Sequence, residues 1–148
     1  MKIICTNNES DAKPYSPLPM GNGDLSLMID YTGNTTTRFY SNNQILTGIW
    51  RAGYRLDNAQ SELVSFGYFE HVLNGEAKEK EWTQTLDLDF PSVECRCTYD
   101  NGITVETNAY CLLNYNLVAI HKRVIGDASL IMRLSFQAPP HDQSCAGQ

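Results

Sequence analysis

Residues 93–111, VECRCTYDNGITVETNAYC, predict a β-hairpin. Apolar and polar side chains alternate on both sides of Asp100-Asn101-Gly102, as they do in strands with one buried face. A two-residue Asn-Gly turn would set Cys97 opposite Glu106, an apolar side chain against a charged one. A three-residue loop with Gly102 in the left-handed region shifts the register by one residue and removes this mismatch.

The three-residue loop makes every cross-strand pair of the hairpin favourable. The pairs are Tyr99–Ile103, Cys97–Val105 and Val93–Ala109 on the apolar face, and Thr98–Thr104, Arg96–Glu106 and Glu94–Asn108 on the polar face. Paired threonines and opposite charges stabilise a sheet when they lie directly across from each other. We therefore expect the bulged register.

Similar alternation extends over most of the chain. We expect further strands at residues 2–6, 25–31, 64–73, 82–90, 117–125 and 128–136, with residues 78–81 as a solvated connection. Gly21-Asn22-Gly23 and Gly33-Asn34 predict turns, the second leading into residues 35–40 as a hairpin. Gly126-Asp127 predicts a hairpin between the last two strands. About eight to ten strands without a helical pattern predict an all-β, antiparallel β-sandwich at residues 1–138, followed by an extended or disordered tail at 139–148.

Three faces of these strands follow from the alternation. In the strand at 25–31, the predicted buried face consists of Leu25, Leu27 and Ile29, with Asp30 on the opposite side. In the strand at 64–73, one face carries Phe66, Tyr68 and Val72. In the strand at 82–90, one face carries Trp82, Leu86, Leu88 and Phe90, and Asp87 and Asp89 point outward.

The amino-acid totals describe one ordinary globular domain. A chain of 148 residues can bury about two thirds of its unfolded surface. The net charge of −6 leaves no basic stripe for a nucleic-acid backbone, and no apolar run approaches the roughly 20 residues of a membrane span. We expect neither partner. The first residues lack a long apolar segment, which predicts a cytoplasmic protein or an exported one whose signal has been removed.

The cysteines and histidines favour structural roles. The five cysteines are Cys5, Cys95, Cys97, Cys111 and Cys145, and the three histidines are His71, His121 and His141. Neither set shows metal-ligand spacing. Buried free thiols are the simpler interpretation of Cys95 and Cys97, and a metal site is the alternative. We expect no metal and no cofactor.

A second stretch resembles a known family. Residues 19–25, Pro-Met-Gly-Asn-Gly-Asp-Leu, are followed by a short alternating segment and then by residues 49–54, Ile-Trp-Arg-Ala-Gly-Tyr. With the later strands, they resemble the start of the N-terminal β-sandwich domain of glycoside hydrolase families 65 and 95, over residues 15–125. Ser26 stands where many relatives have glycine, and Asn42-Asn43-Gln44 is the nearest match to an acidic Asn-Glu motif.

Residues 41–62 show no steady period and predict a long irregular loop, of the kind that carries function. Its candidate sugar-binding residues are Trp50, Arg51, Tyr54, Arg55 and Asp57. An aromatic face ringed by donors and an acceptor suits a sugar ring. The alternative is a loop that only folds Trp50 over the end of the sandwich.

The sequence contains no convincing catalytic pair. A glycosidase needs two facing carboxylates, and Glu106 is already paired with Arg96 in the hairpin. In the families resembled, catalysis belongs to a following (α/α)6 barrel, which this sequence does not contain. The resemblance implies a noncatalytic portion of a carbohydrate-active enzyme that packs on such a helical catalytic domain and lends a loop to its sugar site. The alternative is a stand-alone carbohydrate-binding or protein-interaction module.

Surplus apolar residues predict self-association. Met28, Phe69 and Ile131 fall on the nominally polar faces of their strands. Apolar side chains without a partner domain favour a homodimer in which one copy covers the other or completes its sheet.

Overall fold

The computed structural model describes residues 1–6, 17–22, 25–35, 49–55 and 60–136, with side chains described except at 49–66 and 136. Ten strands are described: β1 (Lys2–Thr6), β2 (Leu18–Gly21), β3 (Leu25–Ile29), β4 (Ile49–Arg55), β5 (Gln60–Leu73), β6 (Glu79–Asp87), β7 (Ser92–Tyr99), β8 (Thr104–Cys111), β9 (Val118–Ile125) and β10 (Leu130–Phe136). The described residues contain no helix, and therefore none that could span a membrane.

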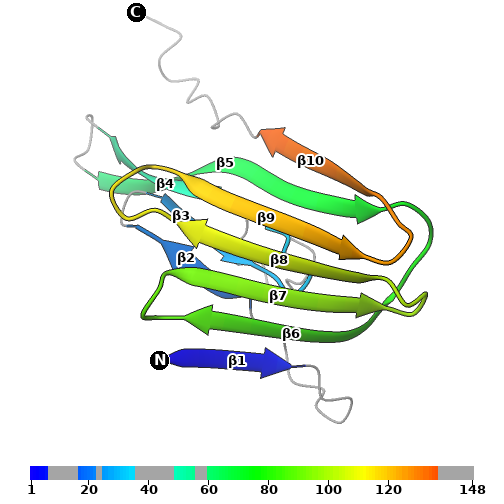
Figure 1. Cartoon of the computed structure of the whole chain (residues 1–148). Coiled ribbons are helices and arrows are strands. Elements are labelled where there is room, and N and C mark those ends of the chain that lie inside the picture. Colours follow the sequence, from blue (N-terminus) through cyan, green and yellow to red (C-terminus); the bar gives the residue numbers. More distant parts are fainter. Residues whose placement is uncertain (7–16, 23–24, 36–48, 56–59, 137–148) are drawn as a thin grey trace, which may run out of the picture.

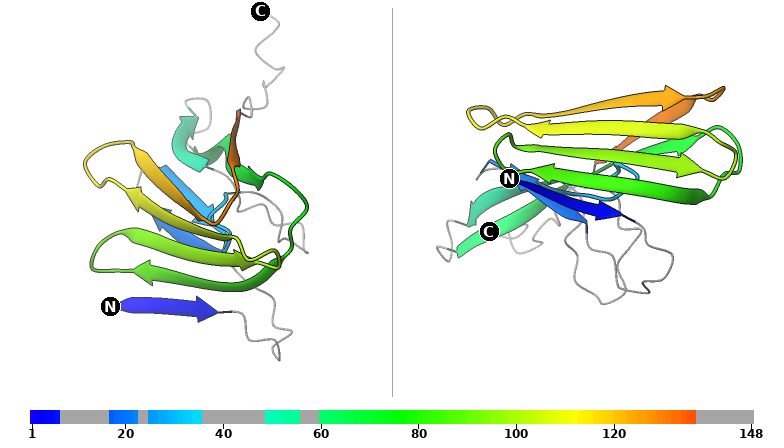
Figure 2. Two further views of the ribbon diagram at one scale, coloured as in Figure 1. Left: turned by 45° about the vertical axis from the view of Figure 1, so that its right-hand side comes forward. Right: turned by 60° about the horizontal axis from the view of Figure 1, so that its bottom comes forward.

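The strands form two five-stranded antiparallel sheets that lie face to face (Figures 1 and 2). The first sheet has the order β1-β6-β7-β8-β9, and the second has the order β10-β5-β4-β3-β2. The predicted all-β, sandwich-like fold is confirmed. The long strand β5 belongs to the second sheet, and the chain then crosses to β6 in the first (Figure 1).

The β7–β8 hairpin has the predicted register. Val93 pairs with Ala109, Arg96 with Glu106 and Thr98 with Thr104. At the loop, the Tyr99 N–H donates to the Ile103 carbonyl at 2.8 Å, and Gly102 has a φ of 82°. The alternation sends Val93, Cys95, Cys97, Tyr99 and Val105 into the core.

Two other local predictions are also confirmed. Residues 2–6 form β1, and the corner predicted at Gly21-Asn22 lies between β2 and β3, which pair as a hairpin; β2 itself was not among the expected strands. Leu27 and Ile29 are buried on β3 as expected. The predicted hairpin strand at residues 35–40 falls almost wholly outside the described residues, as do Cys145, His141 and the tail.

The last predicted hairpin is wrong. β9 and β10 follow each other around Gly126 but do not pair, because β9 adds to β8 in the first sheet and β10 adds to β5 in the second. The turn therefore carries the chain from one layer to the other. Both strands alternate in a way that suits either sheet, so local pattern does not decide the partner.

Five smaller expectations are corrected. Residues 49–55 and 60–62 are strand rather than irregular loop, and residues 79–81 begin β6 rather than a solvated connection. Leu88 and Phe90 lie in the turn after β6 and are exposed. The buried face of β5 near its end carries His71 and Leu73 rather than Tyr68 and Val72. Asp30, expected on the polar side, is fully buried because β3 ends at Ile29 and the chain turns inward.

A buried polar belt divides the core between the sheets into two apolar clusters. One cluster contains Leu18, Met20, Leu27, Ile29, Val93, Cys95, Ala109 and Cys111, and the other contains Leu73, Cys97, Tyr99, Ile103 and Val105. We call the residues between them the inner belt: Gln84, Thr107 and Lys122 from the first sheet, His71 from β5, and the turn of residues 30–34.

Candidate functional site

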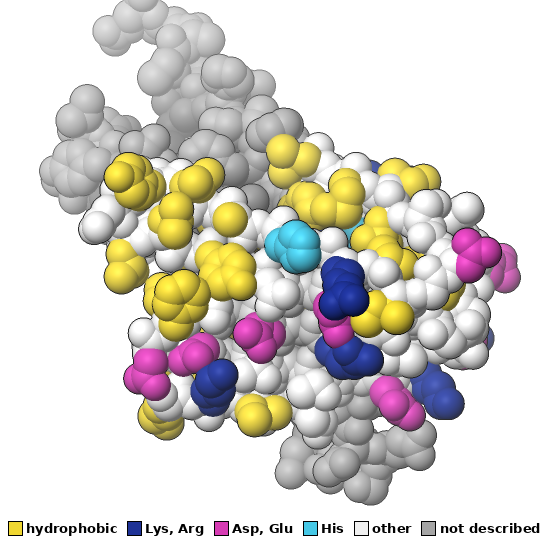
Figure 3. All heavy atoms as spheres, in the orientation of Figure 1, with side chains coloured by type: hydrophobic (Ala, Val, Ile, Leu, Met, Phe, Trp, Pro, Cys, Tyr) yellow, Lys and Arg dark blue, Asp and Glu magenta, His cyan; other side chains and the backbone are white. Residues whose placement is uncertain are grey.

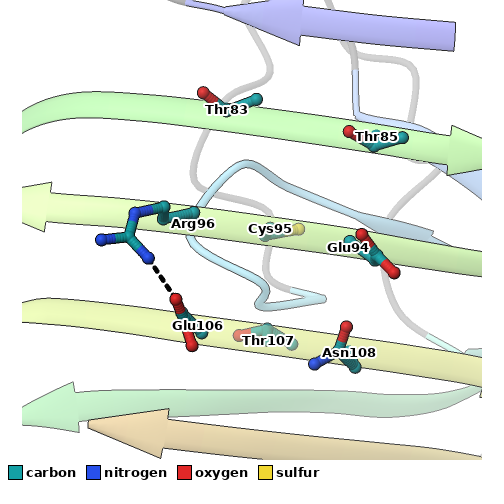
Figure 4. Close-up of a pocket in the computed structure, with 8 residues that line it drawn as sticks. All are labelled: Thr83, Thr85, Glu94, Cys95, Arg96, Glu106, Thr107 and Asn108. Atoms are coloured by element: carbon teal, nitrogen blue, oxygen red, sulfur yellow. Dashed lines mark hydrogen bonds and ion pairs between the residues drawn. The ribbon is translucent and has the colours of Figure 1, made fainter. Parts of the chain in front are cut away.

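A hollow of about 400 Å³ lies on the outer face of the first sheet, over β6, β7 and β8 (Figure 4). We call it the outer hollow. The side chains that face it are Thr83, Thr85, Glu94, Arg96, Glu106 and Asn108. Cys95 and Thr107 also line it, but both residues are buried and their polar side-chain atoms bond to inner-belt partners. The volume is within the range of small-molecule sites.

The register explains why these side chains gather. Thr83 is paired with Arg96 and Arg96 with Glu106, so the three share one row across the sheet. Thr85, Glu94 and Asn108 form the next row in the same way. Directly paired residues point to the same side of a sheet, so both rows face outward together.

The two rows differ in how far their hydrogen-bonding capacity is used. Glu106 accepts from Arg96 and lies 3.8 Å from a guanidinium nitrogen of Arg123. By contrast, no hydrogen bond or ion pair joins the side chains of Thr83, Thr85, Glu94 or Asn108 to any described residue. The outer hollow thus offers two hydroxyls, one amide and one carboxylate to a ligand.

An aromatic pair lies one row further along the same face. Tyr110 follows Asn108 by two residues on β8 and is therefore on its side of the sheet. Its ring meets that of Phe90 edge to face, with centroids 5.8 Å apart. The outer hollow therefore has polar groups beside an apolar, partly exposed ring surface.

The inner belt is the second group of interacting polar side chains. Lys122 Nζ lies 2.7 Å from the Gly33 carbonyl oxygen, 2.8 Å from His71 Nδ1 and 3.0 Å from Thr107 Oγ1. Three near acceptors match the three protons of an ammonium group. Desolvation on burial lowers the pKa of Lys122 to about 8. The ammonium group thus joins the first sheet to β5 and to the turn of residues 30–34.

The carboxyl of Asp30 organises that turn from the other side. Its Oδ1 accepts from the Thr32 N–H at 2.8 Å, the Thr32 hydroxyl at 2.5 Å and the Asn34 N–H at 3.0 Å. Burial raises the pKa of the Asp30 carboxyl, and these hydrogen bonds oppose the rise. The turn of residues 30–34 points backbone N–H groups at the Asp30 carboxyl and the Gly33 carbonyl at the Lys122 ammonium group. The peptide dipoles of the turn therefore interact favourably with both buried groups.

The inner belt bonds mainly to itself and serves the fold. Gln84 Nε2 donates to the Ile29 and Asp30 carbonyls at 2.8 and 3.0 Å, and the Cys95 thiol lies 3.4 Å from the Asp30 carbonyl. Burial raises the pKa of that thiol to about 12, which keeps it protonated and unreactive at neutral pH. Asp30 Oδ2 has no hydrogen-bond partner among the described residues. We assign the belt to holding the sheets in register.

Four of the five predicted sugar-binding residues lie on a strand away from the outer hollow. Trp50, Arg51, Tyr54 and Arg55 belong to β4, in the middle of the second sheet, whereas the outer hollow is on the far side of the first. Their side chains are not described, and Asp57 lies outside the described residues. Binding by these residues remains a prediction.

Sequence reasoning missed the outer hollow and the inner belt, although both left signals. Glu94, Arg96, Glu106 and Asn108 were interpreted as stabilising pairs, but an unusually polar row can also be a binding surface. Lys122 falls in the apolar phase of β9, between Ile120 and Val124. A cation at a core position of an alternating strand indicates a buried polar partner.

No metal-binding group is formed by the described residues: none of their His, Cys, Asp and Glu side chains gather in threes. Cys5, Cys95, Cys97 and Cys111 form no disulfide with any described residue. Comparison with known proteins gives no match to any family model, curated protein or solved structure.

Proposed function

We propose that this chain is a noncatalytic carbohydrate-binding β-sandwich that holds a saccharide in the outer hollow. The observation that carries the proposal is a set of four polar side chains there that make no hydrogen bond or ion pair with a described residue: Thr83, Thr85, Glu94 and Asn108. Exposed polar groups are common, but four that converge on one hollow of about 400 Å³ match the dense hydroxyls of a sugar.

Each part of a sugar ring has a partner in this arrangement. A carboxylate accepts two hydroxyl protons, an amide both donates and accepts, and the ring of Tyr110 offers a surface for the C–H face of the sugar. Among the charged residues that line the hollow, Glu106 is neutralised by Arg96, which leaves Glu94 negative. We therefore expect neutral saccharides to bind better than uronic acids.

The proposal makes the chain a binding unit and not an enzyme by itself. Hydrolysis of a glycosidic bond needs two carboxyl groups in the site. Of the two carboxylates that line the outer hollow, only Glu94 makes no ion pair with a described residue, since Glu106 is held by arginines. We expect the purified chain to turn over no aryl glycoside. Turnover that is abolished by Glu94→Gln would contradict this.

A second role, packing on a helical catalytic domain, is favoured by one observation. Leu112, Leu113, Tyr115 and Leu117 are exposed in the β8–β9 connection. Hydrophobic side chains gather at this end of the molecule, at the left of Figure 3. The Asn22 side chain donates to the Leu112 and Tyr115 carbonyls at 3.1 and 2.9 Å, which holds this apolar end in place. We propose this end as the contact with the barrel that the family resemblance implies. Purified helical barrels of that type, added in trans, should bind the chain, and Leu113→Asp should abolish the binding.

Calorimetry with a panel of neutral and acidic oligosaccharides tests the sugar-binding proposal. Glu94→Gln keeps the shape of the side chain but removes its charge, and the loss of a charged hydrogen bond should weaken binding roughly tenfold. Glu76→Gln, at an exposed position in the β5–β6 connection, is the matched control and should bind like the unaltered chain. Failure of the whole panel, or equal affinity for the two variants, would refute the proposal.

A further inference from the structure

β10 is an edge strand whose outer edge is not paired with any other described strand. Three of its apolar side chains are half exposed: Ile131 by 53%, Met132 by 46% and Leu134 by 54%. Met132 and Leu134 point toward the side of the first sheet, because they pair with His71 and Phe69 on the inward face of β5. They remain exposed because the first sheet ends at β9 and does not cover them.

The other three sheet edges carry features that discourage pairing with another chain. β2 has four residues and contains Pro19, and β1 has five residues and begins with Lys2. β9 carries Lys122 and Arg123. Short length, proline and charge are the usual protections of an edge strand.

β10 lacks these protections. It has seven residues, no proline and no lysine, and its single charge, Arg133, lies 3.7 Å from Glu70 on its own neighbour β5. A long apolar edge of this kind is a template for another strand.

We propose that β10 pairs antiparallel with β10 of a second copy of this chain, about a two-fold axis at Met132. Antiparallel pairing of identical strands is self-complementary, so it closes as a dimer and does not grow into a filament. The two second sheets then form one continuous ten-stranded sheet, five strands from each copy.

The register follows from charge and face. With Met132 on the axis, Leu130 of one copy lies opposite Leu134 of the other, and Ile131 lies opposite Arg133. The inward face then gains an unbroken apolar row from both copies, and each Arg133 keeps its Glu70. Moving the axis to Arg133 would place the Arg133 side chains of the two copies directly opposite each other, and this pairing of like charges is unfavourable.

The proposal is tested by sedimentation of the whole chain over a concentration series. We expect twice the mass of 16.6 kDa at high concentration, with dissociation on dilution because one strand pair is a small interface. Met132→Lys places two like charges on the axis and should give a monomer. Leu88→Lys, at an exposed apolar position in a turn of the first sheet, is the matched control and should remain dimeric.

A cysteine pair tests the register without depending on a charge. Under mild oxidation Met132→Cys should cross-link to itself across the axis, whereas Ile131→Cys should not, because its partner is Arg133. The unaltered chain controls for its own free thiols. A chain that stays monomeric to about 100 μM, a dimer unchanged by Met132→Lys, open-ended assembly, or cross-linking of Ile131→Cys in preference to Met132→Cys would each overturn the proposal.

Discussion

Gly33 and Gly102 have nearly the same backbone conformation, with φ of 78° and 82°, in turns with opposite surroundings. A Cβ added to Gly102 would meet nothing within 4 Å, since that loop projects into solvent. A Cβ added to Gly33 would lie 2.7 Å from Thr107 Cγ2, inside the inner belt. Two turns that look alike in sequence are therefore set apart by what packs against them.

The largest effect is expected from Gly33→Ala. The left-handed position costs about 1 kcal/mol, and the clash with Thr107 adds an overpacking cost of about 1–3 kcal/mol. Thr107 cannot retreat easily because its hydroxyl accepts from Lys122. Urea unfolding should show a loss of about 3 kcal/mol or failure to fold. A loss no larger than that of Gly102→Ala would show that the turn is loosely packed.

Lys122→Met should have the next largest effect, about 2 kcal/mol at pH 7. Methionine fills similar space but leaves the Gly33 carbonyl, His71 and Thr107 without their donor. The matched control is Arg123→Met, which removes the exposed cation next in sequence and should cost less than about 0.5 kcal/mol. Similar losses in the two variants would mean that the inner belt contributes no special stability.

The pH dependence of stability is a second test of the buried environment of Lys122. Burial lowers the pKa of Lys122 from 10.5 to about 8, so above pH 8 the unfolded chain binds more protons there than the folded chain. Stability should therefore rise by about 1 kcal/mol between pH 8 and 9, relative to Lys122→Met. Above pH 9 the Cys95 thiol, whose pKa is raised to about 12, acts in the opposite direction. Denaturant midpoints of both chains at half-unit steps of pH provide the measurement.

Gly102→Ala should cost about 1 kcal/mol, through backbone strain alone. Gly102→Asn should cost less, because asparagine tolerates the left-handed region better than alanine does. Thermal unfolding of the three chains should rank them in that order. An alanine variant as stable as the glycine chain would show that the loop can change its conformation at no cost.

The local parts of the fold could be predicted from the sequence. The register of β7 and β8 follows from side-chain pairs within 19 residues and from one glycine. Residues that are close in the sequence are therefore sufficient to determine it. The outer hollow was not predicted as a site, but the shared face of four of its six polar residues was, since these four belong to this hairpin. Thr83 and Thr85 were not, because β6 joins them only after the sheet has formed.

The long-range parts could not be predicted in the same way. β9 and β10 are separated by a tight turn that usually makes a hairpin, yet each pairs with a different sheet. A period of two residues shows that a strand has two different faces, but it carries no information about which strand lies beside it.

The sequence by itself determined the all-β class, the bulged hairpin and the residues able to take left-handed angles, because these depend on contacts a few residues apart. Only the tertiary structure decided that Asp30 is buried, that Lys122 meets Gly33 from 89 residues away, and that β10 lies at the edge of the second sheet as far as the strands are described. Those outcomes depend on how two sheets stack. Stacking brings distant backbone carbonyls and charges into one low-dielectric space, where each group must find a partner or shift its pKa.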